Sequence, residues 1–180
     1  MSLEIHALSD RKLASIADWQ QAIEAEGFGL QLSAARAFED LKGFLPAQSG
    51  ETKTGFECYH DDARELLVEY DGIDFGREWK FALSFRWGGN LVACLAAYMA
   101  ATAYAKATDG VVFDTEEGQI LTPQQATEYA RQMERDLPGC RRSSIACGGG
   151  AMSRSHERTL DVGRGIPGLG RSAAGTVGAL

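Results

Sequence analysis

Four neighbouring residues carry the side chains best suited to catalysis: Cys58, His60, Asp61 and Asp62. A cysteine thiolate beside a histidine base is a pair used by nucleophilic enzymes, and histidine with carboxylates can also hold a metal ion. Residues two apart on a strand share a face without having to touch, and no second histidine or cysteine stands at metal-ligand spacing. The alternative interpretation is structural: Cys58 belongs to the core, while Asp61 and Asp62 cap a helix.

A second group of reactive side chains is acidic: Asp109, Asp114, Glu116 and Glu117 surround one predicted strand and its turn. Asp71 and Asp74 lie in another predicted turn and complete, with Asp114, Glu116 and Glu117, the carboxylates expected to bind a partner. Paired carboxylates can do acid–base or metal chemistry, but the alternating Asp/Asn ligands and the closing glutamate of a calcium loop are missing. The sequence also contains no P-loop, nucleophile elbow or metalloprotease helix. We therefore predict solvated, charged turns, with no metal, no cofactor and no catalytic residue.

The elements that must position these residues can be predicted from hydrophobic periodicity. Strands are expected over residues 3–7 (at a sheet edge), 30–32, 56–59, 79–87, 111–113 and 119–121. Helices are expected after Ser9 or Asp10, over 34–41, 62–70 and 91–105, and from Thr122-Pro123, with a loop over 46–54. Residues 62–70 could also pair as a strand, because apolar residues alternate there as well. Without a regular βαβ alternation, this order predicts an α+β domain with a mainly antiparallel or mixed sheet packed against helices.

The clearest strand is predicted by five large apolar residues at every second position: Trp79, Phe81, Leu83, Phe85 and Trp87. Lys80, Ala82, Ser84 and Arg86 alternate with them. Alternation of this kind is typical of a strand with one buried face. We expect the large residues to pack on the helix over 91–105, which is apolar on nearly all sides.

Charge divides the chain near Leu137-Pro138-Gly139. Residues 1–138 contain 12 basic and 23 acidic residues, a net charge of −11, whereas residues 139–180 contain 6 and 2, a net charge of +4. The second segment is rich in Gly, Arg, Ser and Ala and has too little apolar area to offset the entropy of ordering. The sequence therefore predicts one folded domain, 1–138, and a disordered tail, 139–180. Such a tail can hold RNA, and the same composition arises when GC-rich DNA is read out of frame.

Composition also limits location and partners. The apolar stretch over 91–105 is shorter than the roughly 20 residues that span a bilayer, and the N-terminus lacks the order of a secretory signal. The four cysteines lack the spacing of a disulfide framework, which favours the cytoplasm. The acidity of residues 1–138 opposes nucleic-acid binding by the folded domain, since phosphate contacts need a basic face. We expect a cytoplasmic protein that avoids membranes and whose folded domain does not bind nucleic acid, and the oligomeric state stays open.

Four segments of the sequence together resemble known proteins. The segments are Phe75–Trp79, Phe85–Asn90, Thr108–Asp114 and the Thr122-Pro123 helix start. Together they resemble small uncharacterised bacterial α+β proteins of the toxin-immunity type. The resemblance implies a cytosolic protein that neutralises a toxin by covering its active site, and it assigns no functional residue.

Two functions follow as expectations. The first is a non-catalytic protein-binding module of immunity type, whose acidic turns hold a basic protein partner. The second is a small enzyme that uses the cluster from Cys58 to Asp62. Small size, acidity and the lack of catalytic motifs favour the first.

Overall fold

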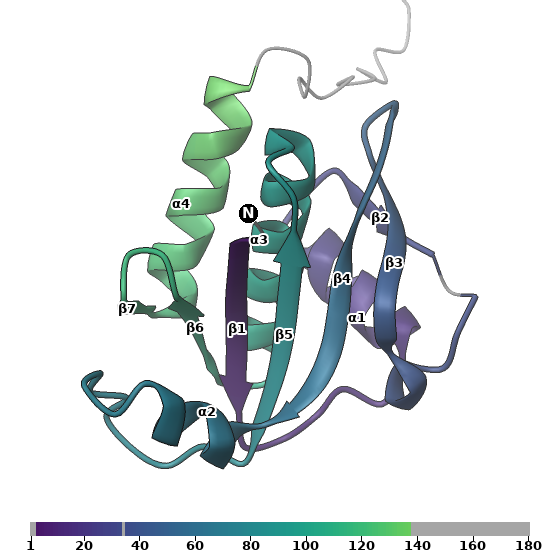
Figure 1. Ribbon diagram of the computed structural model, residues 1–180. Helices are drawn as coiled ribbons and strands as arrows, with labels where there is room; N and C mark the ends of the chain where they lie inside the picture. The colour runs from purple at the N-terminus through teal and green to yellow at the C-terminus, as the bar shows by residue number, and fades with distance from the viewer. Residues whose placement is uncertain (1–2, 34, 138–180) are drawn as a thin grey trace, which may run out of the picture. The chain divides into compact units, whose positions relative to one another are not determined.

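The computed structural model describes residues 3–33 and 35–137, so the predicted tail over 139–180 lies outside the described residues. Its elements are β1 (Leu3–Ser9), α1 (Ile16–Ala25), β2 (Leu30–Leu32), the 3₁₀ helix η1 (Phe38–Asp40), β3 (Lys42–Ser49), β4 (Thr52–Asp62), α2 (Ala63–Glu69), β5 (Phe81–Trp87), α3 (Leu91–Ala107), β6 (Val111–Asp114), β7 (Gln119–Leu121) and α4 (Pro123–Asp136). The strands form one antiparallel sheet in the order β2-β3-β4-β5-β1-β6-β7 (Figure 1). The fold class is α+β, as predicted.

Helices α1, α3 and α4 form a layer on one face of the sheet (Figure 1). Helix α3 is the centre of this layer, because it contacts β1, β4, β5 and β6 as well as the other two helices. Its residues from Leu95 to Ala105 are all buried, and the many alanines among them let the helix lie close to the strands. The indole Nε1 of Trp19 on α1 donates a hydrogen bond to the carbonyl oxygen of Ala100 at 2.9 Å, which joins the two helices. Among the described residues, no helix is both long and apolar enough to cross a membrane.

Helix starts follow the capping chemistry of the sequence. Thr122 and Gln125 form a reciprocal capping box at the start of α4, with Pro123 in its first turn. Asn90 accepts hydrogen bonds from two backbone N–H groups at the start of α3. Asp62 accepts a hydrogen bond from the Arg64 N–H at 2.8 Å, so residues 63–69 form a helix and the strand alternative is wrong. These caps satisfy backbone donors that have no partner within a helix.

The opposite face of the sheet is only partly covered, by α2 and the loop over residues 70–80 (Figure 1). They enclose a second, smaller apolar cluster, made by Leu8, Ala63, Leu66, Phe75, Trp79, Ala82 and Phe113. Trp79 was expected on the other face, against α3. That expectation is wrong, because the strand begins only at Phe81 and the loop before it lies across the opposite face. Leu83, Phe85 and Trp87 do belong to the main core, as predicted.

Four other predictions of local structure are corrected. Strand β1 lies between β5 and β6 in the interior of the sheet, whereas an edge position was expected. Helix α1 is capped by Ser15, because Ser9 belongs to β1 and Asp10 follows it directly. Residues 46–54 belong mostly to the hairpin of β3 and β4 and form no long loop, since cross-strand pairing extends from Lys42–Tyr59 to Ser49–Thr52. Of the predicted helix over 34–41, the described residues 35–41 are helical only at 38–40.

Candidate functional site

The four residues from Cys58 to Asp62 do not assemble into one site. Cys58 is fully buried on the helical face, and burial raises the pKa of its thiol far above the ordinary value. His60 Nε2 lies 2.8 Å from the carbonyl oxygen of Phe38, to which it donates. Asp61 lies on the opposite face of β4, and Asp62 caps α2. A cysteine nucleophile with a histidine base is therefore not formed by Cys58 and His60.

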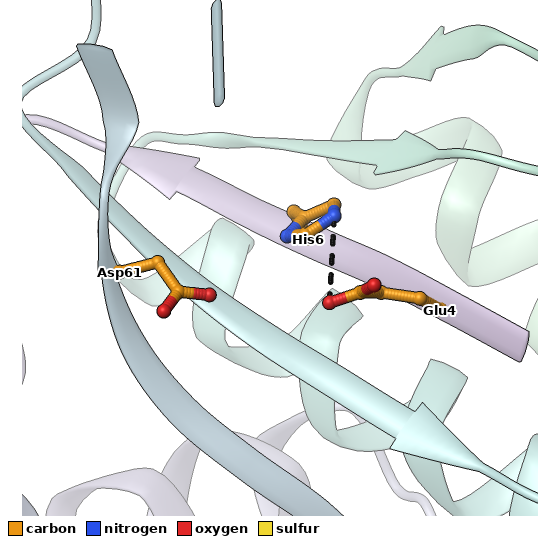
Figure 2. A group of neighbouring side chains, drawn as sticks. All are labelled: Glu4, His6 and Asp61. Atoms are coloured by element: carbon orange, nitrogen blue, oxygen red, sulfur yellow. Dashed lines mark ion pairs between the residues drawn. The ribbon is translucent and has the colours of Figure 1, made fainter. Parts of the chain in front are cut away.

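A different polar group lies on the partly covered face. Strand β1 contributes Glu4 and His6, β5 contributes Ser84 and Arg86, and β4 contributes Asp61. The pairing of β1 with β5 sets Glu4 opposite Arg86 and His6 opposite Ser84, and residues two apart on each strand share a face. Figure 2 shows Glu4 and His6 on β1 with Asp61 approaching from the neighbouring part of the sheet. Antiparallel pairing thus gathers side chains from three distant segments.

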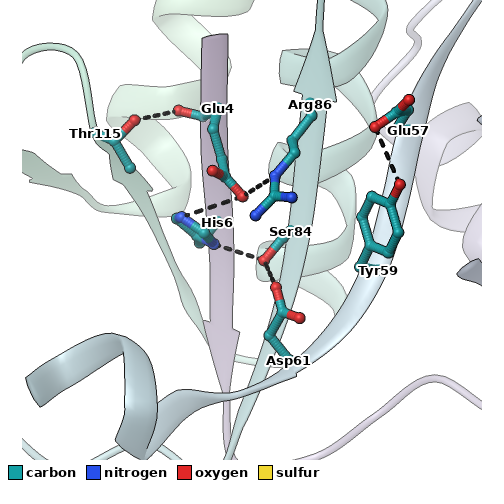
Figure 3. A network of polar contacts seen from close by, with 8 residues as sticks. All are labelled: Glu4, His6, Glu57, Tyr59, Asp61, Ser84, Arg86 and Thr115. Carbon is teal, nitrogen blue, oxygen red and sulfur yellow. Dashed lines mark hydrogen bonds and ion pairs between the residues drawn. The ribbon is translucent and has the colours of Figure 1, made fainter. Parts of the chain in front are cut away.

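Hydrogen bonds join three of these residues in a chain (Figure 3). The Ser84 hydroxyl donates to the Asp61 carboxylate, and His6 Nδ1 lies 2.7 Å from Ser84 Oγ. A hydroxyl has one proton, and Ser84 directs it toward Asp61. His6 Nδ1 must therefore be the donor in its hydrogen bond to Ser84 Oγ. Nucleophilic serine catalysis requires the opposite order, in which histidine takes the serine proton. These two hydrogen bonds therefore place the imidazole proton on Nδ1 and do not activate Ser84 as a nucleophile.

The other imidazole nitrogen of His6 has no hydrogen-bond partner. Nε2 is one of three such buried side-chain atoms among the described residues, and its residue is only 3% exposed. It lies 3.8 Å from Glu4 Oε1, a contact that is an ion pair only when the imidazole is protonated (Figure 2). Burial lowers the pKa of His6 to about 4; the charge of Asp61 opposes this effect and that of Arg86 adds to it. At neutral pH a nitrogen lone pair therefore faces a carboxylate.

Arg86 holds Glu4 in place. Its Nε donates to Glu4 Oε1 at 2.7 Å, and its guanidinium lies over the ring of Tyr59, 5.4 Å from the ring centre. The Tyr59 hydroxyl in turn donates to Glu57 at 3.0 Å (Figure 3). The polar row therefore continues from β1 across β5 to β4.

A cavity of about 210 Å³ opens between α2 and this row. It is lined by Glu4, His6, Asp61, Asp62, Glu65, Leu66, Glu69, Tyr70 and Arg86. Five of these residues are carboxylates and only one is a guanidinium, so the cavity has a net negative charge with His6 neutral. We call it the acidic pocket.

A metal ion could be held only by rearranging this network. Glu4, His6 and Asp61 each offer one ligand atom within 4.8 Å of the others. However, Arg86 already donates to Glu4, and Ser84 bonds both of the other two residues. The guanidinium next to Glu4 also opposes a dication by like-charge repulsion.

The predicted protein-binding carboxylates fall into two groups. Asp71, Asp74, Glu116 and Glu117 are exposed. Asp114 is 2% exposed: the Tyr98 hydroxyl donates to its Oδ2, and the N–H groups of Glu116 and Glu117 donate to its Oδ1 at 3.0 and 3.2 Å. Its carboxylate therefore holds the turn in place. The prediction that Asp114 belongs to an exposed protein-binding surface is wrong.

The two acidic turns adjoin each other, although more than 40 residues separate them. The side chain of Ile73 reaches Gly118, ending 3.6 Å from the position that a Cβ there would occupy. Tyr70, at the end of α2, lines the acidic pocket and packs edge-on against Phe113 with ring centres 4.9 Å apart. Burial raises the pKa of Tyr70, and the charges of Glu69, Glu4 and Glu116 add to this effect. The exposed turns and the acidic pocket thus form one acidic region.

Sequence reasoning missed Glu4, His6, Ser84 and Arg86. Two of them are the polar members of the clearest predicted strand, and the other two alternate in the predicted first strand. The available signal was polar residues at alternate positions of an apolar strand. The local sequence pattern does not indicate that these two strands, β1 and β5, pair with each other.

Comparisons with protein-family models, with curated proteins and with solved structures find no match. The class that the fold and the site define is an α+β protein with an acidic pocket on the partly covered face of an antiparallel sheet.

Proposed function

We propose that this chain is a cytosolic, non-catalytic protein-binding module that holds a basic protein partner, in the manner of an immunity-type inhibitor of a basic toxin. One observation carries the proposal: the turn at Asp71–Asp74 meets the turn at Glu116–Glu117 where Ile73 reaches Gly118, and it directly follows Tyr70, which lines the acidic pocket. Carboxylates gathered from three parts of the chain therefore act as one surface.

The chemistry of the site supports binding without turnover. The Ser84 hydroxyl donates its hydrogen bond to Asp61, and Cys58 is buried with a raised thiol pKa. A thiol of high pKa is a poor nucleophile because the thiolate is the reactive form. The charged groups of the acidic pocket are five carboxylates and one guanidinium, a balance suited to hold a cation.

Electrostatics supports a basic partner. A net charge of −11 over residues 1–138 attracts cationic proteins, and an acidic region on one face orients their approach. Such steering raises the association rate and weakens with salt, because exposed charges are screened beyond about 8–10 Å at physiological ionic strength.

An apolar anchor supports a protein partner over a small ion. Phe44 on β3 is 56% exposed, and its ring lies over Gly55 on β4, where a Cβ would meet the ring at 2.4 Å. A second cavity, of about 200 Å³, lies beside this ring and shares Arg86 with the acidic pocket. Aromatic residues are enriched among the few residues that contribute most of the binding energy at protein–protein interfaces.

We expect the acidic turns to set the rate at which the partner binds. The partner is captured from lysate with the immobilised chain, purified, and its association rate measured at low and high salt. Converting Asp71, Asp74, Glu116 and Glu117 to amides should lower the low-salt rate by about tenfold or more and flatten its salt dependence.

The matched control removes four charges from the helical layer instead, by Asp18→Asn, Glu24→Gln, Glu128→Gln and Asp136→Asn. These side chains are exposed on α1 and α4. If both quadruple variants slow association equally, only net charge matters and the proposed surface is wrong. A captured protein that is acidic, or an association rate indifferent to salt, also contradicts the proposal.

A further inference from the structure

We infer that the acidic pocket receives a single lysine or arginine side chain of the partner. The inference rests on the proposed function and deepens it, because it names the group that the partner must present. It is carried by the charge of the pocket, by an unpartnered atom in its wall and by its size.

The carboxylates occupy two levels of the pocket. Glu4 forms the floor on the sheet and is mostly buried, whereas Glu65 and Glu69 are exposed on α2 and form the rim. Arg86 neutralises part of the floor, and the pocket keeps an excess of four negative charges. A cationic head group that passes the rim therefore loses water as it enters and reaches the Glu4 carboxylate at the end of its path. The attraction between two opposite charges is stronger where water is excluded.

His6 provides a separate indication of a missing cation. Its imidazole is more than nine-tenths buried, and Nε2 has no donor of its own, whereas Glu4 Oε1, 3.8 Å away, already accepts from Arg86 (Figures 2 and 3). A buried acceptor without a donor is costly. An ammonium or guanidinium group supplies several N–H donors to such a place. Nδ1 is fixed by Ser84, so the imidazole cannot turn to relieve the contact without losing that bond.

The size and walls of the pocket suit one side chain. Its volume of about 210 Å³ is below the range of about 300–1,000 Å³ that is common for pockets enclosing a whole small ligand. Leu66 and the ring of Tyr70 provide apolar contact beside the charged groups. Lysine and arginine bury an aliphatic stem against such surfaces while the head group keeps polar partners.

The test uses small probes, so it does not depend on knowing the partner. The isotope-labelled full chain is titrated with Nα-acetyl-lysine methylamide and Nα-acetyl-arginine methylamide, and separately with the neutral norleucine analogue. The cationic probes should produce saturable NMR shifts at the His6 imidazole, the Arg86 Nε–H and the Tyr70 amide. Norleucine should produce none of these at the same concentration.

Variants then test the rim. Glu65→Gln with Glu69→Gln should weaken binding of the cationic probes by about fivefold or more, since two attractive charges are lost. Glu24→Gln with Glu128→Gln removes two charges from the helical layer and should leave the affinity within about twofold. Equal response to norleucine, indifference to the rim variant, or shifts produced only by ZnCl₂ or MnCl₂ would overturn the inference. If the probes fail while partner association still depends on the turn carboxylates, the pocket inference falls and the proposed function stands.

Discussion

Leu83→Ala should lower the free energy of unfolding by about 2–5 kcal/mol, the range for truncating a fully buried leucine. Leu83 is 1% exposed on β5, where it pairs with Ala7 of β1 and His60 of β4 and belongs to the main core. The helix over this face, α3, has alanine at 8 of its 17 positions, so many of the side chains facing the space left behind are short. Since relaxation would be incomplete, we expect a cavity and its cost.

Urea denaturation measures this effect as a shift of the midpoint at constant slope. Val68→Ala on α2 is the control, because Val68 is 77% exposed and its truncation should change stability by no more than about 0.5 kcal/mol. If Leu83→Ala behaved like Val68→Ala, the assignment of Leu83 to the helical core would be wrong.

Asp114→Ala should lower the free energy of unfolding by about 1.5–3 kcal/mol, because one buried donor and two part-buried donors would lose their acceptor. The carboxylate joins α3 to the turn after β6: the Tyr98 hydroxyl donates to one oxygen and two backbone N–H groups donate to the other. Burial raises the pKa of Tyr98, and its hydrogen bond to Asp114 adds to this effect, so the phenol stays a donor at neutral pH.

Asp74→Ala is the matched control for this anchor. Asp74 also accepts a backbone hydrogen bond, from the Gly76 N–H at 2.8 Å, but it is exposed and water can replace it. Thermal or urea unfolding of the two variants should therefore differ by more than about 1 kcal/mol. If both variants lost the same free energy of unfolding, Asp114 would have to be accessible to solvent. It would then belong to the proposed binding surface.

Periodicity and capping predicted the elements whose signals are local. Helix α3 starts at Leu91 as predicted, α4 starts at its capping box, and the short strands β2, β6 and β7 lie where they were expected. Residues 46–54 were misassigned because Pro46 and Gly50 are typical of loops. In the fold, Pro46 lies opposite Gly55 and accepts a hydrogen bond from the Ser33 N–H, so pairing on both sides of β3 outweighs local preference.

The site could not be predicted because its residues become neighbours only through topology. His6 and Ser84 are 78 positions apart and meet because β1 inserts between β5 and β6. The contact between Ile73 and Gly118, which joins the two acidic turns, is likewise invisible in local pattern. Charge composition did predict an acidic surface, but it could not separate exposed Glu116 from buried Asp114, because both lie at the end of the same short strand.

The central claim is that the partner covers the acidic region on the partly covered face of the sheet, and hydrogen–deuterium exchange of the complex tests it most directly. With the partner bound, amides over residues 69–76 and 115–118 should exchange more slowly, and so should those of α2 around the acidic pocket. Amides on the exposed sides of α1 and α4 should be unchanged. Protection confined to α1 and α4, with no change around the acidic pocket, would contradict the account.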